Sequence, residues 1–373
     1  MGRIRLARAR GLAGSGVVSW EVRIAETPTE ADAARLVAFV AASPSGHLYQ
    51  YPLIDRTAAG PRVRTICAWA ESSGTIGASA VARLRRTRGF GPWTARIDRG
   101  PVVEDLTALA PLLETLGARL RKEGAASIRV NPLRRREDDA GLGDALSALG
   151  FTPVADDDYD VTLEVDIAHD REALLLSFPK GTRYTIRQAI KAGVVADREV
   201  GDLEIGALEA IYASMVGRKG ATPRPPGFFH AIAAFLAANP SLGFIQVARH
   251  QGQIVASIVV TRYGHRALYT FGASKDVDDG IPKTHLLQFE AMVAARSLGC
   301  TVYDLGGFSA GVGEEGSRNA TQSINFFKSR FTKNAVAFMP CRERVLRPVL
   351  HRLVEGARRL AGVPPAGAWK ASP

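Results

Sequence analysis

At 373 residues the chain is longer than one ordinary domain, and its 46% hydrophobic and 23% charged residues are typical of a folded protein with real cores. A net charge of +11 favours anionic partners, which include nucleic acid, phosphorylated sugars and lipid head groups. The three cysteines are far apart and the seven histidines are scattered, which argues against a disulfide framework or a metal site. No apolar run is long enough for a membrane helix or a signal peptide, so we expect a cytoplasmic protein.

The first half of the chain is expected to form one α/β unit after a disordered tail of residues 1–18. Thr27 or Thr29 can cap a helix that carries Leu36, Val37 and Val40 inward. The elements predicted after it are a hairpin with a Ser-Ser-Gly turn, a strand, a helix and a buried strand, in residues 64–86, 93–97, 106–124 and 125–132.

The second half repeats this order, with a hairpin, a strand, a helix and a buried strand in residues 243–263, 267–274, 283–299 and 301–307. Five residues recur at a constant offset of 178: Ala70, Gly74, Ile76, Ala78 and Ser79 match Ala248, Gly252, Ile254, Ala256 and Ser257. We therefore expect an α/β protein with two tandem copies of one unit, each a mixed sheet flanked by helices.

The repeat sets the expected domain boundaries. The first domain is placed at residues 19–165, and the second, with a basic connecting helix, at residues 166–341. Residues 342–373 are expected to form a basic amphipathic C-terminal helix and a tail. We expect this helix to pack on the second domain with its arginines in water, and contact with a membrane surface is the alternative.

The connecting helix carries a run of cations. Lys180, Arg183, Arg187 and Lys191 recur every three or four residues and share one helical face. Such a stripe is either an ordinary solvated face or a binding surface for an anion. No residue of opposite charge follows at the spacing of one turn, which favours an anion over the face.

Residues 303–331 combine a short strand, a Gly-rich loop and an aromatic-basic run. The strand is expected to stop at Gly306-Gly307, where glycines let the backbone approach a ligand closely. Lys328 follows Phe327 and precedes Arg330, and a cation beside aromatic rings can hold a phosphate or a developing oxyanion. The alternative is a turn followed by an amphipathic strand with a solvated lysine.

A second candidate binding segment is ATPRPPGFFHAI, which contains Arg224. Its prolines fix the loop, and Phe228 and Phe229 offer a stacking surface beside a guanidinium. This combination suits a nucleotide diphosphate, because the guanidinium can bind phosphate oxygens and the rings can stack on a base. The alternative is the start of a helix with buried phenylalanines and an exposed arginine.

The segment from Arg86 to Gly91 matches the RxxGxG pyrophosphate loop of acetyl-CoA-dependent acetyltransferases. That chemistry requires a helix directly after the loop, so that the amides at its N-terminus can bind the pyrophosphate. Here Pro92-Trp93 and a predicted strand follow instead. We therefore expect an acyl donor other than acetyl-CoA.

Seven motifs between about Ser45 and Phe338 occur in the order of a known family. They are GHLYQ, RGPV, KxxRxxIRxAxKxGV, TPRPPGFF, YTFGAS, YDLGG and NFFKSRF. With these motifs the chain resembles the FemABX aminoacyltransferases, in a compact form without the long helical arm of some members. The resemblance implies two tandem acetyltransferase-like (GNAT-like) domains, in agreement with the internal repeat.

The resemblance also implies roles for individual residues. Phe327 and Lys328 correspond to the catalytic pair that meets the acceptor end of tRNA and the reacting ester. The groups that bind the precursor correspond to Arg56, Arg224, Phe228 and Phe271. The basic face of Lys180, Arg183, Arg187 and Lys191 is left to contact tRNA. Asn131 stands where some relatives have an aspartate, so a carboxylate base is not expected there.

The implied reaction is transfer of an amino acid from aminoacyl-tRNA to an amine on the stem peptide of a peptidoglycan precursor, UDP-MurNAc-pentapeptide or lipid II. No cofactor besides the aminoacyl-tRNA donor is expected. Three alternatives stay open: tRNA-dependent transfer to another amine, acetyl-CoA N-acetyltransfer, and a non-catalytic RNA-binding module. The sequence does not identify the donated amino acid or the acceptor amine.

Overall fold

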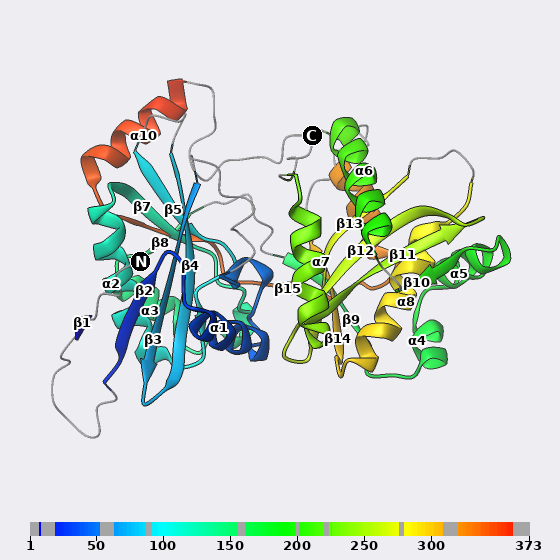
Figure 1. Ribbon diagram of the computed structural model, residues 1–373, viewed down its shortest axis with the longest axis horizontal. Coiled ribbons are helices and arrows are strands. Elements are labelled where there is room, and N and C mark those ends of the chain that lie inside the picture. Colours follow the sequence, from blue (N-terminus) through cyan, green and yellow to red (C-terminus); the bar gives the residue numbers. More distant parts are fainter. Residues whose placement is uncertain are drawn as a thin grey trace. The chain divides into compact units, whose positions relative to one another are not determined.

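A computed structural model of the chain describes residues 7–8, 19–52, 63–86, 92–154, 161–198, 201–219, 224, 226–275, 280–308 and 320–360. The chain forms two compact units, divided between residues 160 and 161 and again between residues 336 and 337. In the part of the chain that the structure describes, the second unit is one segment within residues 161–336, whereas the first also takes up the segment that follows residue 336 (Figure 1).

The first unit is built on one mixed sheet. Its strands lie in the order β1-β2-β3-β4-β5-β7-β16-β8, with β6 on β4, and only β5 and β7 pair in parallel. The strand bounds are β1 Ala7–Arg8, β2 Glu21–Ala25, β3 Val63–Ser72, β4 Thr75–Arg86, β5 Trp93–Ile97, β6 Val102–Val103, β7 Ala125–Val130, β8 Thr152–Pro153 and β16 Arg342–Val345. The helices are α1 Glu30–Ala42, α2 Leu109–Lys122, α3 Leu142–Ala148 and α10 Pro348–Leu360. Leu109, Leu112, Leu113, Leu116 and Leu120 of α2 are buried against the sheet.

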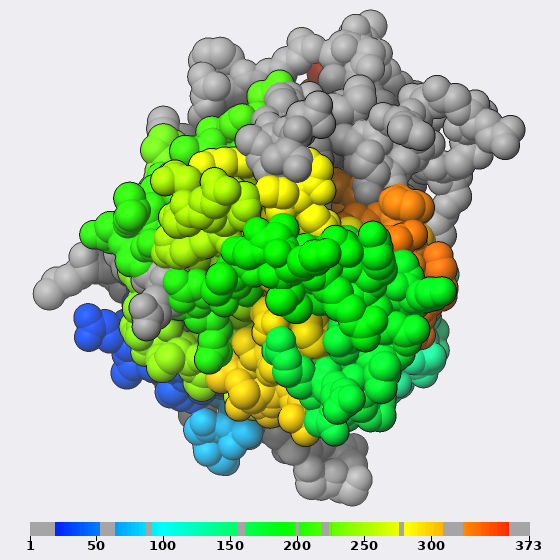
Figure 2. Space-filling view, turned by 90° about the vertical axis from the view of Figure 1, so that its right-hand side faces the viewer, coloured from blue at the N-terminus to red at the C-terminus, as the bar shows by residue number. Residues whose placement is uncertain are grey.

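The second unit has a smaller sheet of the same kind, in the order β10-β11-β12-β13-β14-β9-β15. Its strands are β9 Val161–Asp166, β10 Val195–Asp197, β11 Gly243–His250, β12 Gln253–Tyr263, β13 Arg266–Ser274, β14 Val302–Gly307 and β15 Ala335–Ala337. Its helices are α4 Arg171–Ser177, α5 Lys180–Lys191, α6 Asp202–Lys219, α7 Phe228–Ala238, α8 Lys283–Ser297 and α9 Ala320–Ser329. Helix α8 packs on β11 and β12 and also contacts α5, while α6 packs on β12 and β13. Figure 2 looks onto this unit and shows the green helical segments over much of its face.

The internal repeat predicted from the sequence is confirmed by the strand register. In both hairpins a β-bulge follows the first matching alanine, Ala70 in β3 and Ala248 in β11. The matching turn glycines both have positive φ, at 81° for Gly74 and 76° for Gly252. Each hairpin is followed by a strand, a helix and a further strand, as the sequence predicts, and in both units the structure pairs this last strand in parallel with the one before the helix.

The strands at the domain boundaries differ from the expected division. Residues 161–166, assigned to the end of the first domain, form β9 and pair with β14 in the second sheet. Residues 342–345 form β16, which lies between β7 and β8 in the first sheet. The expected contact of the C-terminal helix with the second domain is wrong, because α10 packs against β7 of the first unit.

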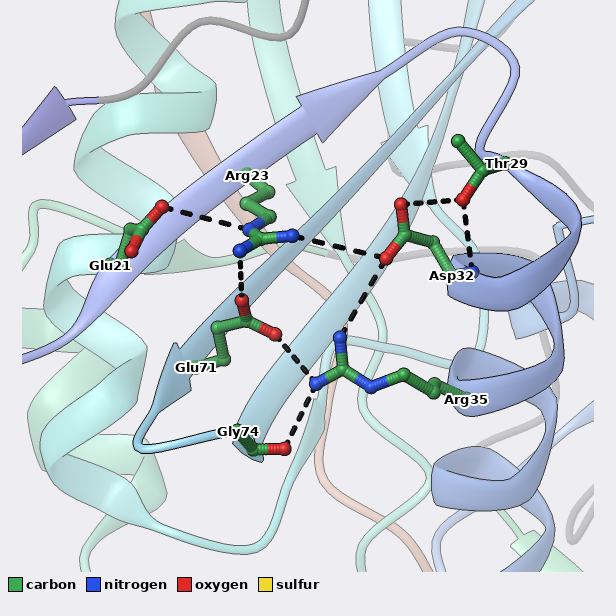
Figure 3. A network of polar contacts seen from close by, with 7 residues as sticks. All are labelled: Glu21, Arg23, Thr29, Asp32, Arg35, Glu71 and Gly74. Atoms are coloured by element: carbon green, nitrogen blue, oxygen red, sulfur yellow. Dashed lines mark hydrogen bonds and ion pairs between the residues drawn. The ribbon is translucent and has the colours of Figure 1, made fainter.

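An ion-pair network fastens α1 to the first hairpin (Figure 3). Thr29 Oγ1 accepts a hydrogen bond of 3.1 Å from the Asp32 amide and caps the helix, as the sequence predicts. Glu71 of β3 lies 2.8 Å from Arg23 Nη2 and 2.6 Å from Arg35 Nη2. The network joins β2, β3 and α1 on the outside of the sheet, so we interpret it as structural.

Candidate active site

Lys328 lies near the C-terminal end of α9 and is only 7% exposed. Its Nζ donates hydrogen bonds to the carbonyl oxygens of Gly306 and Gly307, at 3.0 and 2.6 Å. Burial lowers the pKa of Lys328 from 10.5 to about 8, and the nearby negative charge of Asp304 partly opposes this shift. The alternative of a solvated lysine on a strand is wrong, because Lys328 is buried on a helix and holds the end of β14.

The end of β14 is where the two parallel strands of the second sheet stop pairing. Strands β13 and β14 pair from Arg266 and Val302 to Leu268 and Asp304 only, although both strands continue. In the first unit the equivalent strands β5 and β7 pair along the full length of β5. Backbone groups beyond Asp304 are therefore available to other partners, and the carbonyls of Gly306 and Gly307 accept from Lys328.

Asp304 anchors this strand end through a buried charged cluster. Arg266 Nη1 donates to Asp304 Oδ2 at 2.8 Å, and both side chains are almost fully buried. Asp304 Oδ1 accepts from the Gly306 amide at 2.7 Å and from the Thr162 hydroxyl. The carboxylate thus fixes the turn at Gly306 and supplies the negative charge nearest to Lys328 that affects its pKa.

Phe327 packs into an aromatic group behind Lys328. Its ring centroid lies 5.1 Å from that of His285 and 5.4 Å from that of Phe331, and His285 stacks on Phe331 at 5.5 Å. Burial and, to a smaller extent, the positive charge of Arg330 lower the pKa of His285 to about 4, so its imidazole is neutral at physiological pH. This packing fixes the end of α9 and, with it, the position of Lys328.

Arg224, Phe228 and Phe271 lie together in the second unit. The Arg224 guanidinium carbon lies 5.4 Å from the ring centroid of Phe228 and 5.1 Å from that of Phe271. The two rings pack edge to face and are only 4% and 8% exposed. Helix α7 begins at Phe228, and Phe228 and Phe229 are both buried, so the alternative of a helix start with buried phenylalanines is confirmed, although Arg224 is half-buried and not exposed. Buried rings offer no open face to a base, and we interpret them as a support for the half-buried Arg224.

The four predicted cations of the connecting helix lie on α5, whose bounds Lys180–Lys191 match the prediction. Lys180, Arg187 and Lys191 are exposed, while Arg183 is half-buried and donates to the Leu176 carbonyl at 2.9 Å. Within the part of the chain that the structure describes, none of the four forms an ion pair. The charge of this face is therefore not neutralised by the neighbouring described side chains.

Two other predicted positions belong to the first unit. Arg56 lies outside the described residues. Asn131 is buried directly after β7, and its backbone amide donates to the carbonyls of Ile97 and Gly100, at 3.2 and 3.0 Å. The RxxGxG match is followed by strand β5 and not by a helix, as predicted. Residues 87–91 of the match lie outside the described residues.

Several residues of the site were not singled out from the sequence. Arg266 and Asp304 are 38 positions apart and meet only because β13 and β14 are parallel neighbours. His285 lies within the mostly buried helix α8, and no motif of the sequence marks it. Asp304 is itself part of the YDLGG motif, which is the local signal that points to it.

Among the described residues, no cluster of His, Cys, Asp and Glu side chains has the geometry to hold a metal ion. The described helices are all too short or too polar to cross a membrane.

A family model described as an acetyltransferase (GNAT) domain matches residues 178–329, which include α5, the end of β14 and Lys328. In sequence the chain is 24% identical over 176 residues to the UDP-N-acetylmuramoylpentapeptide-lysine N(6)-alanyltransferase of Weissella viridescens. That match covers 47% of this chain and 49% of the relative, so the chain matches about half the length of this curated protein.

Solved structures show the fold over most of the chain. The crystal structure of FemX superimposes with a TM-score of 0.75 at 17% identity, covering 86% of this chain and 98% of FemX. L-PGS from Bacillus licheniformis gives 0.55 at 13% identity, with 90% and 98% covered. A tandem GNAT protein from the clavulanic acid biosynthesis pathway gives 0.50 at 13% identity, with 88% and 99% covered. The chain thus consists of two tandem GNAT-like domains, and in sequence and fold it resembles the FemABX aminoacyltransferases.

Proposed function

We propose that this protein transfers an amino acid from aminoacyl-tRNA to an amine on the stem peptide of a peptidoglycan precursor. The observation that carries the proposal is Lys328, a buried cation fixed at the point where β13 and β14 separate. The similarity to the Weissella relative, a UDP-N-acetylmuramoylpentapeptide-lysine N(6)-alanyltransferase, supports the choice of reaction and acceptor.

In this reaction the amine nitrogen of the acceptor forms a bond to the ester carbonyl carbon, and the bond from that carbon to the ribose oxygen breaks. The proton of the amine ends on the ribose hydroxyl. Two of the three ammonium hydrogens of Lys328 are held by Gly306 and Gly307. The third can meet the developing oxyanion, where a buried cation stabilises charge more strongly than water does.

The acceptor amine must lose a proton before it attacks. A lysine-type amine with a pKa near 10.4 is neutral in about one molecule in a thousand near pH 7.4. Position 131 is an asparagine, so it has no carboxylate that could take this proton. The imidazole of His285 is neutral, but it is packed against the rings of Phe327 and Phe331 and is not free to accept the proton. We infer that water or groups of the substrates accept it.

Arg224 is the group we assign to the pyrophosphate of the precursor. Its guanidinium is held against two aromatic rings and can offer a planar, bidentate contact to phosphate oxygens. We assign Arg56 to the same substrate on the resemblance alone. A lipid-linked precursor would require contact with the inner face of the membrane, which the exposed Val349 and Leu353 of the basic helix α10 support.

The test is a transfer assay with labelled aminoacyl-tRNAs and, as separate acceptors, UDP-MurNAc-pentapeptide and lipid II, with products identified by mass. Lys328→Met should lose transfer by about 100-fold or more, as expected for removal of a group that stabilises the oxyanion. The matched control is Lys333→Met, which removes an exposed lysine five positions away.

The alternatives predict different results. Transfer at the wild-type rate by Lys328→Met would contradict the role of this lysine. Transfer to other amines but to neither precursor would favour a different acceptor polymer or peptide. Binding of acetyl-CoA, measured by calorimetry, with acetyl transfer would favour an ordinary acetyltransferase. RNA binding without any transfer would favour a non-catalytic module.

A further inference from the structure

The exposed face of α5 carries an aromatic ring among its cations. Lys180, Tyr184, Arg187 and Lys191 follow one another at spacings of four, three and four residues, which places them on one side of the helix. Tyr184 is 62% exposed, whereas Thr182, Ile186 and Ala189 of the opposite side are buried. A ring exposed to this extent between uncompensated cations contributes little to the packing of this unit.

A second exposed ring lies at the end of α9. Phe326 is 66% exposed, and the guanidinium carbon of Arg330 lies 5.6 Å from its ring centroid. Phe326 comes directly before Phe327 and two residues before the buried Lys328. Phe326 is therefore a largely exposed ring within two residues of Lys328.

Direct contacts join these two features into one surface. Thr182 Oγ1 donates to the Arg330 carbonyl at 2.6 Å. A Cβ at Gly181 would lie 2.7 Å from Arg330 Nη2, so the arginine lies against the first turn of α5. Gly181 is three positions before Tyr184 and neighbours it on the helix, so Arg330, with Phe326 beside it, lies close to Tyr184.

We propose that Tyr184 and the Phe326–Arg330 pair form a stacking platform for the unpaired nucleotides at the 3′ end of the donor RNA. Single-stranded nucleic acid is bound by cations that follow its backbone and by rings or guanidinium planes that stack on its bases. A base-paired stem hides its base faces and needs only the cations. The platform rests on the proposed function, in which this RNA is the aminoacyl donor.

An anionic membrane could also attract rings and cations. The RNA end is favoured because the Phe326–Arg330 pair combines an exposed ring with a guanidinium, which suits stacking on a base and which a lipid surface would not require. The membrane is therefore an outcome of the test and not a second proposal.

The experiment measures binding of two labelled RNA hairpins at one fixed salt concentration. They share a stem, and one has a short unpaired 3′ overhang while the other is blunt. The wild type should bind the overhang hairpin more tightly. Tyr184→Ala and Phe326→Ala should each weaken overhang binding by about 5- to 100-fold and leave blunt binding nearly unchanged. Tyr184→Phe, which keeps the ring, should restore binding.

Three controls make the outcome decisive. Leu203→Ala removes an exposed apolar side chain of α6 that is not on the platform and should change neither affinity. Lys191→Ala should weaken both hairpins equally and reduce the salt dependence. Circular dichroism checks that the variants are folded. We expect them to fold, because both rings are largely exposed.

Equal losses for both hairpins, or no loss in either ring variant, would overturn the platform. So would phosphatidylglycerol vesicle binding that depends on Tyr184 while overhang binding does not. Ring-dependent overhang binding without any aminoacyl transfer would refute the proposed function but keep the platform. Transfer by Tyr184→Ala with an unchanged KM for aminoacyl-tRNA would refute the platform but keep the proposed function.

Discussion

Lys328 Nζ lies 3.0 Å from the carbonyl oxygen of Gly306, and this contact joins the end of α9 to the end of β14. Gly306 has a φ of +72°, and its amide donates to Asp304 at 2.7 Å. The left-handed turn thus fixes the peptide groups on which the ammonium group is held. Position 306 and position 328 are 22 residues apart in sequence but act as one unit in the site.

Transfer should require the charged form of Lys328, whose pKa is lowered to about 8 by burial. The alkaline limb of the single-turnover rate should therefore begin near pH 8, after correction for the rising neutral fraction of the acceptor amine. Asp304 raises this pKa, so Asp304→Asn should move the limb to lower pH. A limb at the same pH in both proteins would contradict the assignment of the limb to Lys328.

The lowered pKa of Lys328 also affects stability. Between pH about 8 and 10.5 the unfolded chain binds more protons at this lysine than the folded chain does, so the free energy of unfolding should rise with pH across this window. The rise is up to about 3 kcal/mol. Urea denaturation of the wild type and of Lys328→Met should show it in the wild type only, because methionine does not titrate.

His285 should make the second unit sensitive to acid. Its pKa is lowered to about 4 by burial and by Arg330, so the unfolded chain binds the proton first as pH falls below 6.5. Stability is therefore lost between about pH 6.5 and 4. His285→Phe should lose less stability than the wild type when urea denaturation at about pH 7 and pH 5 is compared. An identical loss in both would assign the acid sensitivity to other groups.

Removal of one partner of the Arg266–Asp304 pair should be costly. Arg266→Met leaves the buried Asp304 carboxylate without its cation, which typically costs about 3 to 5 kcal/mol. The double variant Arg266→Met/Asp304→Asn should recover part of this loss, because it no longer buries an unpaired charge. A double-mutant cycle by urea denaturation measures the coupling, and additive losses would show that the two side chains act independently.

Gly306→Ala tests the turn itself. An alanine with positive φ costs about 1 to 2 kcal/mol, and its Cβ would lie 3.1 Å from the Tyr269 carbonyl oxygen. The variant should be less stable and should transfer more slowly, because the carbonyls that hold Lys328 move. Gly356→Ala in α10 is the control: its Cβ meets no atom within 4 Å, and it should be neutral or stabilising.

Arg224→Lys tests whether the planar guanidinium matters. A lysine keeps the charge but cannot stack on Phe228 and Phe271 or bind two phosphate oxygens at once. Affinity for UDP-MurNAc-pentapeptide, measured by calorimetry at fixed salt, should fall by about 10-fold or more. The exposed Arg296 provides the control variant Arg296→Ala. An unchanged affinity would remove Arg224 from the precursor site.

The repeated unit could be predicted from sequence because its signals are local. Alternating burial, turn glycines and a helix of regular period recur at a fixed offset, and the bulges at Ala70 and Ala248 agree with it. The partners of short strands could not be predicted. The composition of a strand such as β9 or β16 does not indicate which of the two sheets it joins. For the same reason Arg266 and Asp304 appear unrelated until β13 and β14 are seen side by side.

Phe228 and Phe271 show that composition alone does not predict whether the side chains of a site are buried. Their positions near Arg224 could be expected, but burial depends on which helix covers the strand, and helix α7 begins at Phe228 itself. Tyr184 shows the opposite case, since the basic stripe of α5 was evident and the exposed ring within it was not.

The position of β16 has a consequence for biosynthesis. This strand lies between β7 and β8 of the first sheet, yet the whole second unit precedes it on the chain. A ribosome therefore completes residues 161–336 before it releases the strand that joins β7 to β8. We expect the second unit to reach its native packing during translation. Until β16 is released, the first unit has an unpaired edge at β7, so we expect it to be the part that depends on chaperones.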